Sequence, residues 1–224
     1  RRPLLSTPSP YTTLFRSLIQ ANSFKLALHG DVTVLGVFKL AQADFLIMVG
    51  GGTFTHTFPD SPFNQSGHNF AASSRSYSQT LNEGDWAIGF TSSMSFFSLA
   101  ELSVSGWVNS NGHFDFRLNG NLNLGAAGCG LFGNFAFRVF LNETQFGLQI
   151  SASVKAKLFG ITLAGVSFDA EFVATRSADA EVVVKLSVTV EIQILFVKVK
   201  KTATFNLGVI CIPPVPHLGT MGQD

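Results

Sequence analysis

Strict alternation of apolar and polar residues is the feature that most constrains how this chain can fold. In residues 181–201, EVVVKLSVTVEIQILFVKVKK, an apolar side chain occupies every second position from Val182 to Phe196. Successive side chains of a β-strand point to opposite faces of a sheet, whereas a helix repeats every 3.6 residues. The same alternation recurs in residues 114–124 and 146–158. It predicts strands with one apolar face and one polar face.

The pattern predicts an all-β fold of about eleven long strands. The expected strands cover residues 24–34, 37–49, 53–58, 85–91, 94–108, 113–124, 131–141, 146–158, 160–173, 181–199 and 202–210. Short connections between them make consecutive strands antiparallel neighbours. Because the apolar face must be covered, we expect an antiparallel meander that forms a sandwich or a flattened barrel. The apolar positions switch from odd to even numbers at Gly165, which predicts a β-bulge there.

Changes in composition set the expected domain boundaries. Residues 18–210 form a single all-β domain, interrupted by a long loop excursion at 50–84 that is rich in Gly, Ser, Asn and Pro. Residues 211–224 hold three prolines, which cannot donate to a strand ladder, and are expected to form a Pro-rich extended tail.

The N-terminal residues carry a resemblance of a different kind. Residues 10–17, PYTTLFRS, resemble the translation of a sequencing-library adapter, and the similarity extends back to residue 7. This implies that residues 1–17 are a disordered artefact and that the true N-terminus is missing. Without Arg1, Arg2 and Arg16, Lys and Arg fall from 15 to 12 against 14 acids, so the net charge moves from +1 to −2. The sequence therefore gives no case for a nucleic-acid partner.

Overall composition excludes two classes of protein. A chain with 46% hydrophobic and 13% charged residues is too apolar to be disordered. No window is long and apolar enough for a transmembrane helix, so we expect no integral membrane helix. Phenylalanine, with 23 residues against two Trp and two Tyr, suits a dry interior because it has no polar group to satisfy.

Two motifs suggest a bound metal or cofactor, and both are better explained without one. His56, Asp60 and His68 lie in one loop and are the candidate metal ligands, but their spacing matches no common site. The segment GCGLFG at 128–133 has the G-x-G-x-x-G form of a dinucleotide site. It is followed by a strand-like pattern rather than a helix, which predicts a glycine-rich hairpin turn and no cofactor.

Several single residues are candidates for modification or surface roles. Cys129 and Cys211 could form one disulfide or remain two buried thiols. Asn64 and Asn142 begin glycosylation sequons in expected loops. We expect the lysines near two strand ends to lie on a solvated face and to guard those ends against edge pairing. They are Lys155, Lys157, Lys198, Lys200 and Lys201.

No hydrolase, phosphate-loop or zinc-protease motif occurs, so nothing nominates an enzyme and no catalytic residue is assigned. Residues 94–173 loosely resemble the strand repeats of very large extracellular microbial proteins. This implies a structural or adhesive β module from a larger secreted or cell-surface protein, which would contact other β modules or a second copy. One alternative is a protein that binds lipid or another apolar ligand on its Phe-rich face. The other is an outer-membrane β-barrel, against which the scarcity of Tyr and Trp counts.

Overall fold

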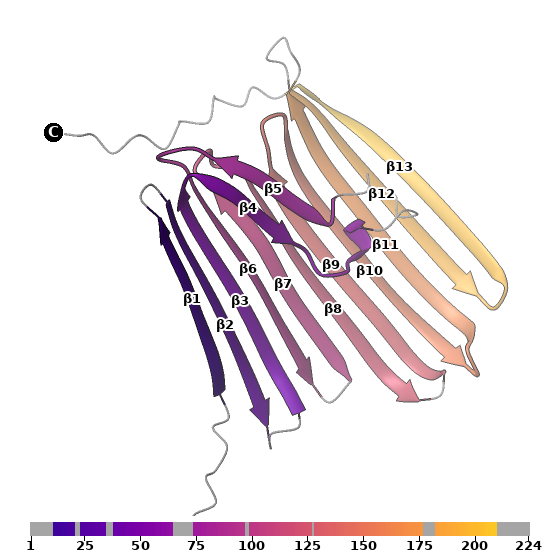
Figure 1. Cartoon of the computed structure of the whole chain (residues 1–224). Helices are drawn as coiled ribbons and strands as arrows, with labels where there is room; N and C mark the ends of the chain where they lie inside the picture. The colour runs from indigo at the N-terminus through magenta and orange to yellow at the C-terminus, as the bar shows by residue number, and fades with distance from the viewer. Residues whose placement is uncertain are drawn as a thin grey trace, which may run out of the picture.

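The computed structural model describes residues 11–20, 23–34, 38–64, 74–96, 99–126, 128–176 and 182–209. Eleven strands form one open sheet, and two more form a separate hairpin that crosses one face of it (Figure 1). The strands of the large sheet are β1 (Tyr11–Gln20), β2 (Ser23–Val34), β3 (Phe38–Gly50), β6 (Trp86–Phe96), β7 (Ala100–Asn109), β8 (Phe114–Ala126), β9 (Cys129–Leu141), β10 (Gln145–Leu158), β11 (Ile161–Arg176), β12 (Val182–Ile194) and β13 (Val197–Val209). The hairpin consists of β4 (Gly52–Thr57) and β5 (Ser76–Leu81), with the short 3-10 helix η1 (Pro62–Asn64) between them.

The large sheet is an antiparallel meander, which confirms the predicted fold class. Its strands are ordered by sequence, and the order is interrupted only where β4 and β5 leave between β3 and β6. Among the described strands, β1 and β13 are the two edges and do not pair with each other. The flattened-barrel alternative is therefore wrong, and within the described residues the second layer over this sheet is the β4–β5 hairpin with η1.

The two segments with unusual composition contain strands. The excursion expected at 50–84 holds both strands of the hairpin, which pair from Gly52↔Leu81 to Thr57↔Ser76. At the N-terminus, β1 pairs with β2 along its whole length. Part of the segment that resembles an adapter therefore lies in an edge strand. The expected tail at 211–224 lies outside the described residues.

The longest expected strand is divided in two. The sequence predicts one strand over residues 181–199, but β12 ends at Ile194 and the chain turns at Leu195 and Phe196 before β13 begins. Ile194 pairs with Val197 across this turn, and Leu195 has a φ of 51°. The turn was missed because both of its residues are apolar, whereas turns with φ above zero favour Gly, Asn and Asp.

Two local features occur where glycines suggested them. The register of β10 and β11 shifts between Ala156 and Lys157, which leaves Leu163 as an extra residue two positions before Gly165. The expected bulge is thus present, slightly displaced. The GCGLFG segment forms a hairpin turn and the start of β9, as predicted, and Gly128 has a φ of 76°.

Pairing places the predicted apolar sets on one face of the sheet, called the apolar face below. Leu118 of β8 lies opposite Phe137 of β9, which lies opposite Ile150 of β10. Ile150 in turn lies opposite Ala170 of β11, and Ala170 opposite Val188 of β12. The side chains between these positions point to the other side, called the polar face, so alternation in the sequence becomes two chemically different faces.

The covered face is the polar one, which reverses the expectation that the apolar face forms the core. The β4–β5 hairpin packs on the polar face, and its main cluster of buried side chains consists of Met48, Phe54, Phe58, Leu81, Ala87 and Trp107. The apolar face is largely open: along β12, Val184 is 1% exposed but Ile192 is 49% exposed. Among the residues that the structure describes, no helix has the length and apolar character needed to cross a membrane.

Candidate functional site

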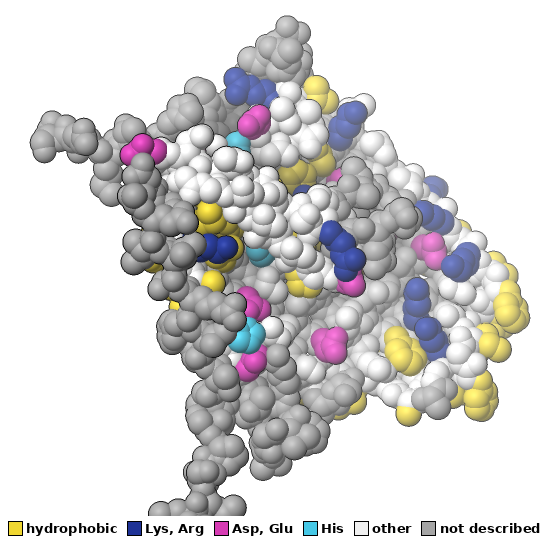
Figure 2. Space-filling view, viewed as in Figure 1, with side chains coloured by type: hydrophobic (Ala, Val, Ile, Leu, Met, Phe, Trp, Pro, Cys, Tyr) yellow, Lys and Arg dark blue, Asp and Glu magenta, His cyan; other side chains and the backbone are white. Residues whose placement is uncertain are grey.

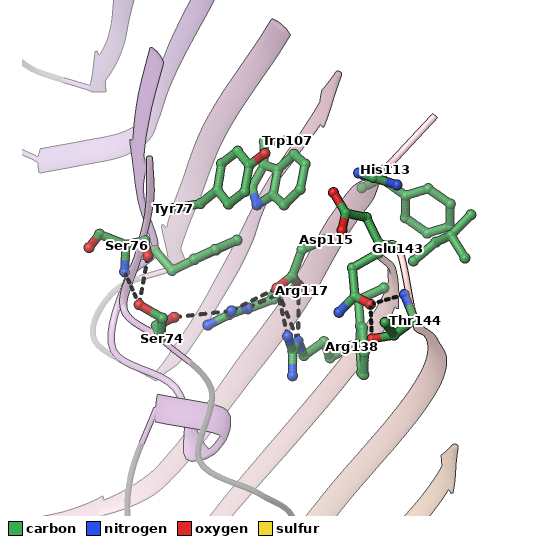
Figure 3. Close-up of a pocket in the computed structure, with 15 residues that line it drawn as sticks. Ser74, Ser76, Tyr77, Trp107, His113, Asp115, Arg117, Arg138, Glu143 and Thr144 are labelled. Atoms are coloured by element: carbon green, nitrogen blue, oxygen red, sulfur yellow. Dashed lines mark hydrogen bonds and ion pairs between the residues drawn. The ribbon is translucent and has the colours of Figure 1, made fainter. Parts of the chain in front are cut away.

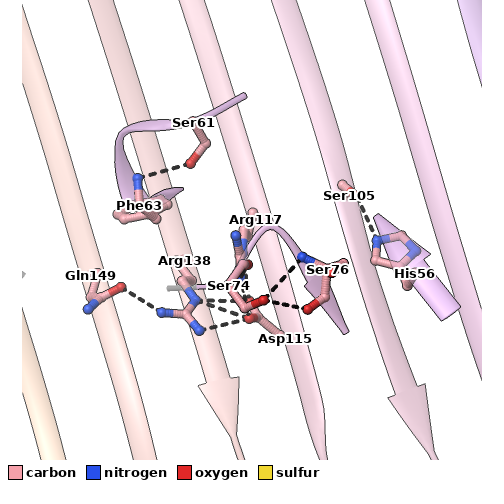
Figure 4. Close-up of polar contacts among 10 residues, drawn as sticks. All are labelled: His56, Ser61, Phe63, Ser74, Ser76, Ser105, Asp115, Arg117, Arg138 and Gln149. Carbon is pink, nitrogen blue, oxygen red and sulfur yellow. Dashed lines mark hydrogen bonds and ion pairs between the residues drawn. The ribbon is translucent and has the colours of Figure 1, made fainter. Parts of the chain in front are cut away.

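The polar face carries a buried ion-pair cluster beneath the hairpin. Arg117 on β8 and Arg138 on β9 are directly opposite in register, and Asp115 lies two residues before Arg117 on the same face. Both guanidinium groups donate to the Asp115 carboxylate, each with a shortest Nη2–Oδ2 distance of 2.8 Å. Arg138 also donates to Gln149 Oε1 at 3.1 Å, and Gln149 donates to Glu171 at 2.6 Å. The network therefore spans four strands, and Figure 4 shows Arg138 between Gln149 and Asp115.

The electrostatics of this cluster follow from its burial. Burial alone would raise the pKa of Asp115, but hydrogen bonds from Arg117 and Arg138 more than offset that effect and hold the pKa below its usual value. Asp115 is therefore a carboxylate at neutral pH. The Arg117 guanidinium lies 3.5 Å from the centroid of the Phe58 ring and donates to the Ser74 carbonyl oxygen at 3.2 Å. These contacts attach the hairpin to the sheet.

A pocket of about 390 Å³ opens beside this cluster, between the hairpin and the polar face of β7, β8 and β9 (Figure 3). Tyr77 and Trp107 stack on one side of it, with ring centroids 3.5 Å apart and planes inclined by 8°. The turn at 142–144 lies on the other side. The buried charged groups that line the pocket, Asp115, Arg117 and Arg138, are bonded to one another, and Arg117 is bonded to the hairpin. The cluster is therefore best explained as a structural clamp.

The candidate metal ligands are not brought together among the described residues. His56 is 7% exposed, and its Nε2 lies 2.9 Å from the Ser105 hydroxyl. Burial, aided by the charge of nearby Arg117, lowers the pKa of His56 to about 4, so it is neutral at pH 7. Asp60 is at the surface and accepts a hydrogen bond from Arg75. His68 lies outside the described residues, and within them no group of three His, Cys, Asp or Glu is placed to hold a metal ion.

The remaining candidate residues have local structural contacts or lie outside the description. The Cys129 sulfur accepts a hydrogen bond from the Phe159 N–H at 3.1 Å. Cys211 is outside the described residues, so the disulfide stays a prediction. Asn142 Oδ1 accepts from the Thr144 N–H at 3.0 Å and shapes an exposed turn. Only the backbone of Asn64 is described, in η1, so glycosylation at either asparagine also stays a prediction.

In the described part of the chain, much of the apolar face is left without a covering layer. Its large side chains that are more than about a third exposed lie on every strand of the large sheet from β3 to β13. They are Phe45, Val49, Met94, Phe96, Leu102, Leu122, Leu124, Leu131, Phe135, Val154, Leu158, Ile161, Val166, Phe168, Val190, Ile192, Ile194, Val197, Val199 and Phe205. Contiguous exposed apolar surface on this scale marks an interaction site in a stable protein.

Two grooves cross this face. The first has a volume of about 400 Å³, and its floor is formed where Gly120 and Gly133 replace the side chains expected at apolar-face positions. Gly120 lies between Leu102 and Phe135 across the strands, and Gly133 between Leu122 and Val154.

The second groove, of about 330 Å³, shares Val154 with the first and runs over the small residues Ala156 and Ala164 towards β12. Sequence reasoning missed both grooves. The only available signal was glycine at positions where the alternation calls for a large residue.

The chain matches no protein-family model, no curated protein and no solved structure.

Proposed function

We propose that the protein is a non-enzymatic β module that binds apolar ligands, and that acyl chains of lipids occupy the two grooves of the apolar face. The observation that carries the proposal is the exposure of large apolar side chains on this face from β3 to β13, while the hairpin packs on the opposite face of the sheet. Each 100 Å² of apolar surface left in water costs roughly 2.5 kcal/mol. A ligand without polar groups recovers that free energy when it covers the face.

The shape and chemistry of the grooves favour an acyl chain over a compact polar ligand. The polar residues that border the first groove alternate with its apolar walls and so project from the opposite face of their strands. They are Glu101, Asn121, Asn134 and Ser153. The walls are therefore aliphatic and aromatic, and the two grooves meet at Val154. A long, flexible, unbranched chain can follow such a path, and groove volumes of this size are typical of small-molecule sites.

A structural module is the second candidate, favoured by the open edge of the sheet. β13 is exposed from Val197 to Gly208 and pairs with no further strand among the described residues, so its outer backbone groups are available to one. In that case the apolar face would be covered by another β module of a larger secreted or cell-surface protein. The lysines of β13 would then limit unintended pairing at this edge.

A groove-filling experiment tests lipid binding. Added Cβ atoms at Gly120 and Gly133 would have their nearest neighbours at 3.6 Å, an ordinary contact distance, and neither glycine has a positive φ. The double variant Gly120→Val, Gly133→Val should therefore fold normally while its side chains occupy the groove. We expect its affinity for the fluorescent fatty acid cis-parinaric acid to fall at least about tenfold, which corresponds to about 1.4 kcal/mol. Fluorescence titration of detergent-free protein measures this.

Gly30→Val is the matched control. A Cβ at Gly30 meets nothing within 4 Å, and Gly30 pairs with Ala43, away from both grooves. This variant should bind the fatty acid like the wild type. Equal binding by the groove-filled and wild-type proteins, or no binding by the wild type, would contradict the proposal. A wild-type dimer that buries the face in sedimentation experiments would favour the structural alternative.

A further inference from the structure

The two ends of the sheet have turns of opposite chemistry. At one end the turns are built from polar residues that satisfy the backbone: Asn109 Oδ1 accepts from the N–H groups of Asn111 at 3.1 Å and His113 at 3.0 Å. Asn142 plays the same part in the next turn along this end. A meander of hairpins requires such turns, so folding alone accounts for the polar residues at this end.

The turns at the opposite end, called the tip end below, are apolar. It is defined by Leu99, Phe159, Leu195 and Phe196, in the connections from β6 to β7, β10 to β11 and β12 to β13. Phe159 is 82% exposed and Phe196 is 84% exposed. Figure 2 shows hydrophobic side chains gathered along the rim where β10 to β13 turn.

Folding does not account for these side chains. Phe159 has a φ of 50° and Leu195 a φ of 51°, in the left-handed region that Gly and Asn tolerate and that bulky residues avoid. A residue forced into this region destabilises the fold, and Phe159 recovers little by burial because it lies almost wholly in solvent. The same chain places asparagine in its turns at the other end, so the tip end departs from the chemistry that the backbone favours.

The tips are held together as one edge. The Gly160 N–H donates to the Gly128 carbonyl oxygen at 2.9 Å, which joins the β10–β11 turn to the β8–β9 turn. The Leu195 N–H donates to the Leu163 carbonyl oxygen at 2.8 Å, which joins the β12–β13 turn to β11. The exposed rings are therefore presented along one edge by hydrogen-bonded backbone.

Basic side chains lie directly behind these tips. Within five residues of the β10–β11 and β12–β13 turns, the described strands hold five lysines and a single acid, Glu191, whose carboxylate lies 3.6 Å from Lys198 Nζ. The five are Lys155, Lys157, Lys198, Lys200 and Lys201. Figure 2 shows Lys or Arg side chains next to the hydrophobic rim. The sheet brings together two groups that lie about forty residues apart in the sequence.

We propose that the tip end docks on the surface of an anionic lipid membrane, with Phe159, Leu195 and Phe196 in the interfacial layer and the lysines against the headgroups. Exposed apolar side chains bounded by lysines match the surface of an anionic bilayer, where negatively charged headgroups lie a few ångströms above an apolar layer. Each lysine near such a surface contributes attraction that salt screens. The proposal concerns a different surface from the grooves and does not rest on them.

Substitutions at the turns test the proposal without endangering the fold. In the triple variant Phe159→Asn, Leu195→Asn, Phe196→Asn, two asparagines replace residues with positive φ, and an asparagine directly before Gly160 gives the Asn-Gly turn that hairpins favour. We expect this variant to unfold at the same temperature as the wild type or higher. Its affinity for vesicles of phosphatidylcholine and phosphatidylserine, with the anionic lipid as the minor component, should fall more than about tenfold. Co-sedimentation of the full chain with the vesicles measures this.

A charge variant and a control separate the two parts of the proposal. A quadruple variant removes four of the five lysine charges: Lys155→Gln, Lys157→Gln, Lys198→Gln, Lys200→Gln. It should bind the mixed vesicles several-fold more weakly and should no longer prefer them to vesicles of pure phosphatidylcholine. The groove-filled variant should bind vesicles like the wild type, so failure of lipid-chain binding and failure of docking are distinguishable. The proposal is overturned if the wild type binds neither vesicle, or if the triple variant binds both as tightly as the wild type. It is also overturned if the triple substitution instead dissolves a dimer of this chain.

Discussion

The Asp115→Ala variant is expected to lose about 3 to 5 kcal/mol of unfolding free energy. Asp115 is the carboxylate that neutralises Arg117 and Arg138, whose side chains are 2% and 11% exposed. Without it, two like charges remain buried and opposite each other in register, and both lose the carboxylate that bonds them. Urea unfolding at pH 7 measures the loss.

Asp60→Ala is the matched control, because it removes an ion pair of the same chemistry at the surface. Asp60 and its partner Arg75 are 76% and 61% exposed. Exposed pairs contribute about 0 to 1 kcal/mol, so this variant should unfold close to the wild type. If Asp115→Ala also stays within about 1 kcal/mol of the wild type, the polar face is not covered as described.

The Phe54→Ala variant is expected to lose about 3 to 5 kcal/mol as well, for an apolar reason. Phe54 is 0% exposed and lies in the cluster that joins the hairpin to the sheet, with Tyr77 at 6.4 Å between ring centroids. Its ring also lies over Gly89, where an added Cβ would be 3.0 Å from Phe54 Cζ. Truncation leaves a cavity that neither neighbour can fill. The midpoints of thermal and urea unfolding should therefore both fall.

Phe205→Ala provides the comparison on the other face. Phe205 is 52% exposed on β13, so truncation should change the unfolding free energy by less than about 1 kcal/mol. A chain whose core lay on the apolar face would show the opposite order, with Phe205→Ala the more damaging of the two. The pair of variants therefore reports which face carries the stability.

The strands and their two faces could be predicted because side-chain alternation is a local property of the backbone. Knowing that Val188 and Ile192 share a side requires only their spacing. Deciding whether water or protein covers that side requires knowing what packs there. The sequence predicts the first strand of the covering hairpin, at 53–58, but neither its second strand nor its place on the sheet. Residues 52–57 and 76–81 are short, rich in Thr and Ser, and carry only a weak apolar alternation.

The charged cluster could not be predicted for a related reason. Asp115, Arg117 and Arg138 appear in the sequence as ordinary polar positions of two strands, and only the register of β8 against β9 brings the two arginines opposite each other. Register depends on the length of the turn between two strands. The Asn-containing turns before β8 and after β9 were clear in the sequence, but β8 and β9 are joined by a glycine-rich turn. The turn at Leu195 could not be predicted because a leucine rarely adopts the positive φ that it has there.

Hydroxyl-radical footprinting of the delipidated protein, read out residue by residue by mass spectrometry, tests most directly the claim that the hairpin covers the polar face and leaves the apolar face open. Phe135 and Phe168 on the apolar face are 41% and 39% exposed, while Phe54 and Phe63 in the covering layer are 0% and 1% exposed. The first pair should be oxidised readily and the second pair protected. Protection of Phe135 and Phe168 together with rapid oxidation of Phe54 and Phe63 would contradict this arrangement of the two faces.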